Sequence, residues 1–203
     1  MFTGIVESIG YITAIEMQGG CKKLSIKPLF SFADLIIGES ISINGICLTV
    51  TDFTATLFNV TVVPETLRLT NLANIELHDS VNLERSLKLG DKMGGHYVQG
   101  HVDGVGEILE IAKDNSDAWL VKISLPEKLA KYVVNKGYIT LDGMSITIIE
   151  STPHWFTVTF IPHTQEVTVT KQYTVGKKIN IEVDILGKYI EKIIGAYTHV
   201  NSH

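Results

Sequence analysis

One module is present twice in this sequence, and that internal repeat limits the folds open to the chain. Residues 99–108, QGHVDGVGEI, resemble residues 3–12, TGIVESIGYI, near the chain's own beginning. The recurring residues are Gly4, Val6, Glu7 and Gly10, which reappear as Gly100, Val102, Asp103 and Gly106. Self-similarity of this length indicates a duplication, so the chain is built from two copies of one unit.

The match between the copies becomes tighter downstream. The pair Asn44-Gly45 aligns with Asp142-Gly143, 98 positions later, whereas Gly4 and Gly100 are 96 positions apart. Two extra residues in the polar loop 113–117, KDNSD, account for the difference. Because the turns match best, we interpret them as parts of a binding surface that both copies share.

Apolar and polar residues alternate along much of the chain, which is typical of half-buried strands. The clearest examples are residues 40–44, 58–62 and 81–84, repeated as 138–142, 156–160 and 179–183. Many short strands joined by glycine-bearing turns predict a closed or nearly closed antiparallel barrel in each half. The expected fold is therefore all-β, with a first barrel over 1–96, a second over 97–186, and a helix and tail over 187–203.

Helical patterns are scarce. Residues 28–36 and 126–134 each begin with a proline suited to the first helical position, and they predict short helices covering a barrel end. Residues 65–72 predict one further turn. In the tail, apolar residues at spacings of 4, 3, 4 and 3 form a helical seam at Leu186, Ile190, Ile193, Tyr197 and Val200. The seam must be buried either by its own barrel or by another copy of the chain.

Charge and composition exclude several classes of protein. The 17 Lys and Arg are interspersed with 22 Asp and Glu, for a net charge of −5, so nucleic acid is an unexpected partner. The first ten residues lack the pattern of a signal peptide, and no run of 18 apolar residues predicts a membrane span. Two cysteines, Cys21 and Cys47, do not make a disulfide scaffold, and a reducing, cytoplasmic setting is the expectation.

Four recurring segments predict a ligand site in each copy. Their glycines allow close approach to a flat ligand, and their threonines can hydrogen-bond the edge of a ring. We therefore expect each copy to hold a heteroaromatic molecule. The segments are 3–6 with 99–102, 44–45 with 142–143, 46–50 with 144–148, and 61–66 with 159–164.

The copies differ at positions that could carry chemistry. In the second copy His101 replaces Ile5, Lys136 replaces Gly38, Asp142 replaces Asn44, Ser145 replaces Cys47, and Asp184 replaces Ser86. A histidine with a pKa of about 6.5 can carry protons at neutral pH. Each residue also has a simpler explanation: a surface histidine, a solvated lysine, a turn-forming aspartate, or a small apolar cysteine.

Two other kinds of site fit the sequence poorly. A zinc site at His96 and His101 lacks a third ligand nearby. A nucleophilic triad of Ser145, His101 and Asp142 lacks the G-x-S-x-G turn that exposes a catalytic serine.

At these residues the sequence resembles the riboflavin synthase family, trimeric enzymes with two lumazine-binding repeats. The motifs that carry the resemblance span Met1 to about Lys192: MFTGIVE, NGICLTVT, PETLRLTNL with VNLER, MGGHYVQGHVDG, KGYITLDGMSIT and NIEVDILGKYIEK. The resemblance implies two homologous six-stranded Greek-key barrels in tandem and a C-terminal helix that holds a homotrimer together.

The resemblance also implies the reaction. Two molecules of 6,7-dimethyl-8-ribityllumazine would exchange a four-carbon unit and give riboflavin and 5-amino-6-ribitylaminouracil, with no cofactor and no metal. The first barrel of one subunit would face the second barrel of the next. Whether lumazine synthase is a further partner stays open. A non-catalytic lumazine- or flavin-binding antenna protein is the close alternative, and a flavin-binding electron-transfer barrel is a more distant one.

Roles for individual residues follow from the same resemblance. His101 is expected to transfer protons, Ser145 and Thr147 to bind and polarise the ring, and Cys47 to come from the facing barrel. Asp142, Lys136 and Asp184 would orient the ribityl chain or tune the proton carrier. The expected substrate-binding residues are Gly4, Ile5, Val6, Cys47, Leu48, Thr49, Thr61, Val62, Val63, Pro64, Glu65 and Thr66, then Gly100, His101, Val102, Lys136, Ser145, Ile146, Thr147, Thr159, Phe160, Ile161, Pro162, His163 and Thr164.

Overall fold

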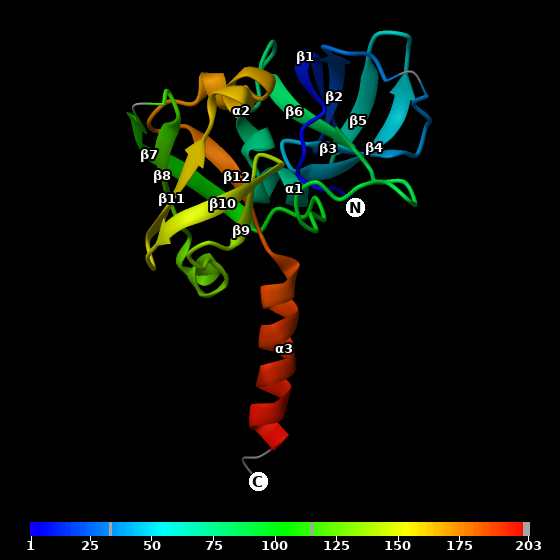
Figure 1. Cartoon of the computed structure of the whole chain (residues 1–203). Coiled ribbons are helices and arrows are strands. Elements are labelled where there is room, and N and C mark those ends of the chain that lie inside the picture. Colours follow the sequence, from blue (N-terminus) through cyan, green and yellow to red (C-terminus); the bar gives the residue numbers. More distant parts are fainter. Residues whose placement is uncertain (33, 115, 201–203) are drawn as a thin grey trace.

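The computed structural model describes residues 1–32, 34–114 and 116–200, with side chains up to residue 196. Two closed barrels lie side by side, and the C-terminal helix projects away from both (Figure 1). The first barrel consists of β1 (Ser8–Gln18), β2 (Cys21–Pro28), β3 (Ser40–Ile43), β4 (Ile46–Phe53), β5 (Phe58–Val62) and β6 (Ser80–Arg85). The second consists of β7 (Gly104–Lys113), β8 (Trp119–Ser124), β9 (Tyr138–Leu141), β10 (Met144–Ser151), β11 (Trp155–Phe160) and β12 (Lys178–Val183).

Both barrels have the same topology. The first runs β1-β2-β5-β4-β3-β6, and the second runs β7-β8-β11-β10-β9-β12, with antiparallel pairing throughout the described strands. The predicted pair of six-stranded Greek-key barrels is confirmed. Each barrel encloses its own core, because the alternating apolar residues of its strands point inward.

Bulges help each small barrel to close. The register of β1 shifts between Ile12 and Ala14, and that of β7 shifts at the equivalent place, between Ile108 and Glu110. Bulges bend a strand and increase its twist, which a six-stranded barrel requires. Their recurrence shows that the two copies kept the same way of closing.

The short helices follow the strands in a repeated pattern. The first barrel has α1 (Pro64–Leu69) and η1 (Asn71–Asn74), and the second has α2 (Pro162–Val167) and η3 (Val169–Gln172). The predicted turn at 65–72 is therefore confirmed, while its counterpart after Pro162 was not predicted. The predicted helix at 126–134 is confirmed as the 3-10 helix η2 (Glu127–Tyr132).

The helix predicted at 28–36 is wrong. Pro28 ends β2, and the described residues that follow form no helix. Phe32 instead packs on the first core, with its ring 6.4 Å from that of Phe58, and the Arg85 guanidinium lies 5.6 Å from the Phe32 ring. A short helix is costly to nucleate, so this segment is fixed by tertiary contacts rather than by its own propensity.

The matched turns of the two copies pack against each other. The Asn82 side-chain amide donates to the Asp142 carbonyl oxygen at 2.8 Å, and Asn180 donates to the Asn44 carbonyl at 2.8 Å. A Cβ on Gly45 would lie 2.7 Å from the backbone nitrogen of Gly143, so only glycine fits. These turns are buried between the barrels, where they join the two repeats, and Asn44 and Asp142 border a pocket there. They match because both form the same two-fold interface.

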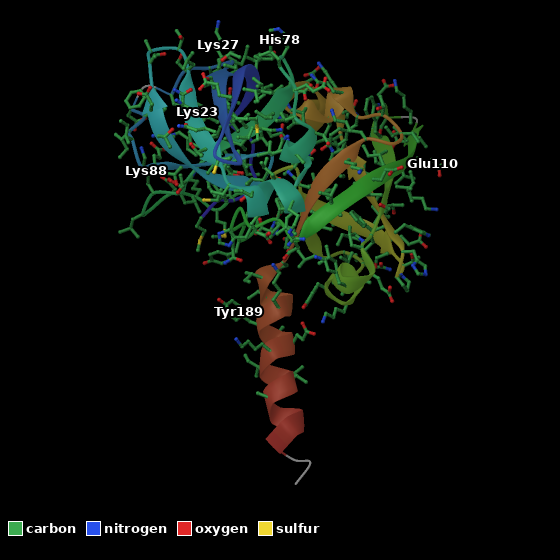
Figure 2. The ribbon with its side chains drawn as sticks, turned by 180° about the vertical axis from the view of Figure 1, so that it is seen from behind. Lys23, Lys27, His78, Lys88, Glu110 and Tyr189 are labelled. Carbon is green, nitrogen blue, oxygen red and sulfur yellow. The ribbon has the colours of Figure 1, made fainter. Side chains whose placement is uncertain are left out.

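The predicted C-terminal helix is α3 (Ile185–Val200). Its N-terminal half touches η2, where Glu191 pairs with Lys131 and accepts a hydrogen bond from Tyr132. The seam residues Leu186, Ile190 and Ile193 are 56–59% exposed, and Figure 2 shows Tyr189 on α3 apart from both barrels. The side chains of Tyr197 and Val200 lie outside the described residues. Among the described helices, none has the length and apolar character needed to cross a membrane.

Candidate functional site

A loop from each repeat docks on a strand of the other barrel. We call the outward-facing surface beside Cys47 on β4 the first mouth, and the outward-facing surface beside Ser145 on β10 the second mouth. The Ser145 amide on β10 donates to the Gly4 carbonyl at 2.8 Å, and the Cys47 amide on β4 donates to the Gly100 carbonyl at 2.8 Å. Val6 accordingly packs on the second barrel's core, and Val102 packs on the first barrel's core. We call residues 3–6 and 99–102 the exchanged loops. Each of the two mouths is thus made by both repeats.

Two buried glutamates hold the exchanged loops. Glu84 on β6 accepts hydrogen bonds from the backbone of Thr3 and Gly4, and Glu182 on β12 accepts them from Gln99, Gly100 and His101. Burial raises the pKa of both carboxyl groups, and the hydrogen bonds from the loops oppose that shift. Sequence comparison could have found this pair, because the two glutamates stand at equivalent positions.

The second mouth contains a serine–histidine pair. Ser145 Oγ lies 2.7 Å from Nδ1 of His96, and Nε2 of that histidine lies 3.2 Å from Thr140 Oγ1. The imidazole is stacked on the Tyr138 ring, with centroids 5.2 Å apart and planes 11° from parallel. Neighbours on both nitrogens and one face therefore fix the orientation of this imidazole.

Burial lowers the pKa of His96, and the negative charge of Asp184 partly offsets that effect. The imidazole is consequently neutral at pH 7 and can accept a proton through its hydrogen bond to Ser145. The sequence analysis assigned proton transfer to His101, and binding and polarisation of the ring to Ser145. Within one chain, the structure brings His96 to Ser145, and it places His101 on the loop over the other mouth.

The first mouth gathers Cys47, His101 and outward-facing threonines. His101 is exposed, and its backbone amide is held by Glu182. Along β4, Cys47 and Thr49 point outward while Leu48 points into the core. For the same reason, Val62 and Phe160 are core residues with no exposed surface. These three predicted binding residues therefore support the wall of a mouth rather than line it.

The remaining predicted binding residues lie around the mouths in equivalent sets. Around the first, Thr61, Val63, Pro64 and Glu65 are exposed and Thr66 is half-buried. Around the second, Ile161, Pro162 and His163 are exposed, as is Thr147, while Ile146, Thr159 and Thr164 are half-buried. Ile5 of the exchanged loop is 49% exposed.

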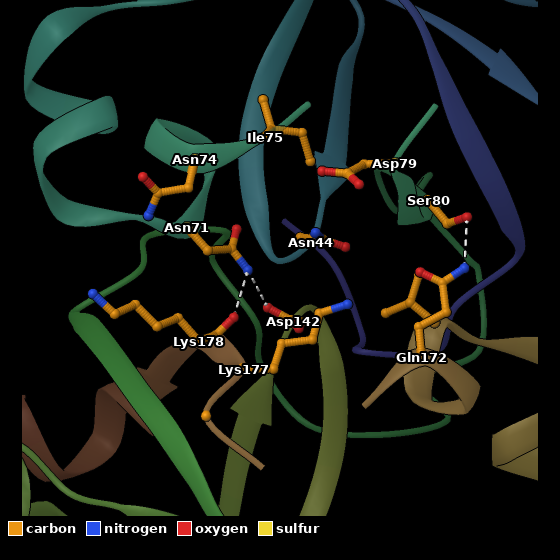
Figure 3. A pocket seen from close by; sticks show the side chains of 12 residues that line it. Asn44, Asn71, Asn74, Ile75, Asp79, Ser80, Asp142, Gln172, Lys177 and Lys178 are labelled. Atoms are coloured by element: carbon orange, nitrogen blue, oxygen red, sulfur yellow. Dashed lines mark hydrogen bonds between the residues drawn. The ribbon is translucent and has the colours of Figure 1, made fainter. Parts of the chain in front are cut away.

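Asp142 lies between the barrels. Its carboxylate accepts hydrogen bonds from the Tyr173 hydroxyl at 2.8 Å and the Asn71 side-chain amide at 2.9 Å, and burial raises its pKa to about 6. It borders a pocket of about 280 Å³ that Ser145, Cys47 and His101 do not line (Figure 3). With both oxygens occupied, the carboxylate links the repeats instead of facing a barrel mouth.

Lys136 and Asp184 occupy structural turns. Lys136 replaces Gly38 at a left-handed position with φ of 64°, and its amide donates to the Ile148 carbonyl as Gly38 does to Val50. Asp184 accepts a hydrogen bond from the Leu186 amide at 3.0 Å, at the start of α3. Within the described part of the chain, no three His, Cys, Asp or Glu residues gather in a way that could hold a metal ion.

Comparison with known proteins agrees with the division of the chain into two repeats. The model of the lumazine binding domain family matches residues 3–86 and 99–184. Riboflavin synthase of Bacillus subtilis (strain 168) is 43% identical over 96% of this chain and 90% of its own length. The chain belongs to the riboflavin synthase family. It is therefore a transferase, like these relatives.

Further relatives cover the chain equally well. Riboflavin synthase of Mycobacterium tuberculosis (strain H37Rv) is 43% identical over 96% of this chain and 98% of its own length. That of Schizosaccharomyces pombe is 42% identical over 97% of this chain and 95% of its own length. Among solved structures, LumP complexed with riboflavin superimposes with a TM-score of 0.82 at 22% identity, over 91% of this chain and all of that one. This likeness shows the same fold.

Proposed function

We propose that the chain converts two molecules of 6,7-dimethyl-8-ribityllumazine into riboflavin and 5-amino-6-ribitylaminouracil, at sites shared between subunits of a homotrimer. The observation that carries the proposal is the unequal pair of mouths. They are built alike, as two like substrates require. Only the second holds a hydroxyl on a buried imidazole, Ser145 on His96.

The reaction begins with loss of a proton from a ring methyl group. Ser145 Oγ takes this proton as its own passes to Nδ1 of His96, so the pair acts as the general base. The resulting carbanion attacks the second substrate ring, and the four-carbon unit is then transferred. Holding the two rings face to face supplies the effective concentration of an oriented pair.

A second subunit supplies the facing mouth. In one chain Cys47 and His101 belong to the first mouth, while Ser145 and His96 belong to the second. Stacking the first mouth of one subunit on the second mouth of the next gathers all four residues around two substrates. His101 then transfers protons from the facing side, and Cys47 and the outward threonines hold the rings. The exposed seam of α3 supports a trimer, because its apolar residues need a partner surface.

In this proposal each of the other polar residues has a single role. Thr147, beside Ser145 on β10, binds a ring edge, and Lys136 faces solvent near the ribityl chain. Asp184 tunes the pKa of His96. Asp142 positions the turn that leads into Ser145. The free thiols Cys21 and Cys47 support a reducing, cytoplasmic location.

Incubation with 6,7-dimethyl-8-ribityllumazine alone tests the proposal. We expect riboflavin and 5-amino-6-ribitylaminouracil in equal amounts, measured by absorbance and chromatography, with no added cofactor or metal. The LumP structures share this fold, so a purely ligand-binding role is the competing function. Tight binding without product would favour that role and reject catalysis.

A further inference from the structure

We propose that Glu84 and Glu182 are positioning residues, each of which sets an exchanged loop over the mouth of the opposite barrel. The proposal rests on the proposed function, because it concerns the two mouths of that reaction. Neither glutamate touches a reacting group in this arrangement. Each acts through the backbone of the loop that it holds.

In the described part of the chain, the hydrogen bonds to the Glu84 carboxylate all come from the first exchanged loop. Its Oε1 accepts from the Thr3 amide at 2.6 Å and the Thr3 hydroxyl at 2.8 Å, and its Oε2 accepts from the Gly4 amide at 3.0 Å. The glutamate is 4% exposed. The loop that it fixes presents the Gly4 carbonyl to Ser145 and places Val6 on the second core.

Glu182 repeats this arrangement for the second exchanged loop. Oε1 accepts from the Gln99 amide at 2.7 Å, and Oε2 accepts from the Gly100 and His101 amides, each at 3.0 Å. The glutamate is 2% exposed. Its loop presents the Gly100 carbonyl to Cys47 and carries His101 over the first mouth.

Burial of a carboxylate is a poor way to gain stability, because its desolvation offsets much of the favourable interaction. Its advantage is geometric, since charge-assisted hydrogen bonds to consecutive amides fix a loop in one position. Both loops also contain a glycine in the left-handed region, Gly4 at φ 77° and Gly100 at φ 78°. Without an acceptor such a turn leaves inward-pointing amides unsatisfied.

Because each exchanged loop lies on the opposite barrel, each glutamate maintains the mouth of the barrel to which it does not belong. Glu84 belongs to the first repeat but maintains the second mouth, where Ser145 lies. Glu182 belongs to the second repeat but maintains the first mouth, where Cys47 and His101 lie. The variants E84Q and E182Q should therefore each damage one mouth and leave the other intact. Gln keeps the size of the side chain but points an amide N–H at the loop amides.

Mixed trimers provide the catalytic test. Homotrimers of either variant contain no intact pair of mouths, and we expect kcat to fall at least tenfold in both. When the variants are co-expressed with different tags and mixed trimers are purified, each trimer has one interface joining two intact mouths. Cyclic symmetry then predicts recovery of about one third of wild-type activity. A merely destabilising role for either glutamate predicts no recovery.

A control pair separates this inference from the proposed function. S145A impairs the second mouth directly, and T49W fills the first. Recovery by this pair but not by E84Q with E182Q would overturn the positioning role. Failure of both pairs would reject the shared site. The milder variants E84D and E182D keep the charge but shorten its reach, and they replace the Gln variants if those do not fold.

Amide chemical shifts test the positioning role without catalysis. E84Q should move the amide resonances of Gly4 and Ser145 while leaving those of Gly100 and Cys47, and E182Q should do the reverse. This crossed pattern follows only if each glutamate acts on the opposite barrel through its loop. Shifts confined to each variant's own barrel would overturn the proposal, whatever the oligomeric state.

Discussion

Ser145 Oγ lies 2.7 Å from Nδ1 of His96, a histidine in the segment that joins the two repeats. The matched stretches of the two repeats begin at Thr3 and Gln99, so His96 lies outside them. Comparison of matched positions therefore could not reveal this residue as a gain of the second copy. Its partner Ser145 was visible, because it replaces Cys47. The difference between the mouths thus rests on the segment that joins the repeats.

The Ser145–His96 pair should behave as one catalytic unit. We expect H96Q and S145A each to lower kcat by about 100-fold or more, the range for loss of a general base. The double variant should be little worse than either single one, because each removes the same proton transfer.

His101 provides the matched comparison, since it lies over the other mouth. H101Q should combine additively with S145A, because the two residues act from different sides of the proposed shared site. Steady-state kinetics of the three single and two double variants complete two double-mutant cycles, one for H96Q with S145A and one for H101Q with S145A. Additive losses for H96Q with S145A would show that the pair does not act together.

The fall of kcat at low pH, the acid limb of the pH profile, should reflect protonation of His96. Its pKa lies below the usual 6.5 because of burial, so activity should be lost only as the pH falls below that value. The Asp184 charge favours the protonated imidazole and raises this pKa. D184N should therefore move the acid limb to lower pH.

Profiles of kcat against pH for wild type, D184N and the remote control D114N would test this assignment. Asp184 also bonds the first turn of α3, so the mass of D184N in solution must be compared with that of wild type. A limb that stays in place in D184N, at unchanged mass, would mean that another group controls it.

Asp142 should make the stability of the protein depend on pH. Its folded pKa of about 6 lies above its ordinary value of 3.8, so the folded state binds the proton more tightly than the unfolded state. The free energy of unfolding should therefore fall as the pH rises from about 4 to about 6, by roughly 3 kcal/mol from this group.

D142N should remove that contribution and keep the fold, because asparagine already occupies the equivalent position, Asn44. Glu84 and Glu182, whose pKa values are also raised by burial, act in the same direction in both proteins. The difference between wild type and D142N in denaturant unfolding at several pH values is therefore the quantity to measure. If the free energies of unfolding of wild type and D142N changed in parallel with pH, a raised pKa at Asp142 would be contradicted.

The repeat and the alternation of residues were enough to predict a barrel in each half, because both can be recognised in the sequence without knowing which residues are in contact. They could not predict which copy each segment would contact. Gly4 and Gly100 were recognised as matched, but their contacts with Ser145 and Cys47 exist only once the barrels pack together. The helix predicted at 28–36 was wrong for a related reason. Phe32 is held by contacts with Phe58 and Arg85, which are remote in sequence.

The exposed seam of α3 should hold the trimer together. Removal of residues 187–203 should leave both barrels folded, because the barrel cores include no residue of this segment. The mass in solution should fall from that of a trimer to that of a monomer, and activity should be lost, since in the proposed trimer each site combines mouths from two subunits. Polar substitution of Leu186, Ile190 and Ile193 to Gln should have the same effect with the helix retained. K192Q, an exposed change on the same helix, is the control and should keep both mass and activity. Light scattering and turnover of the truncated chain decide the matter: a fully active monomer would require a complete site within one subunit.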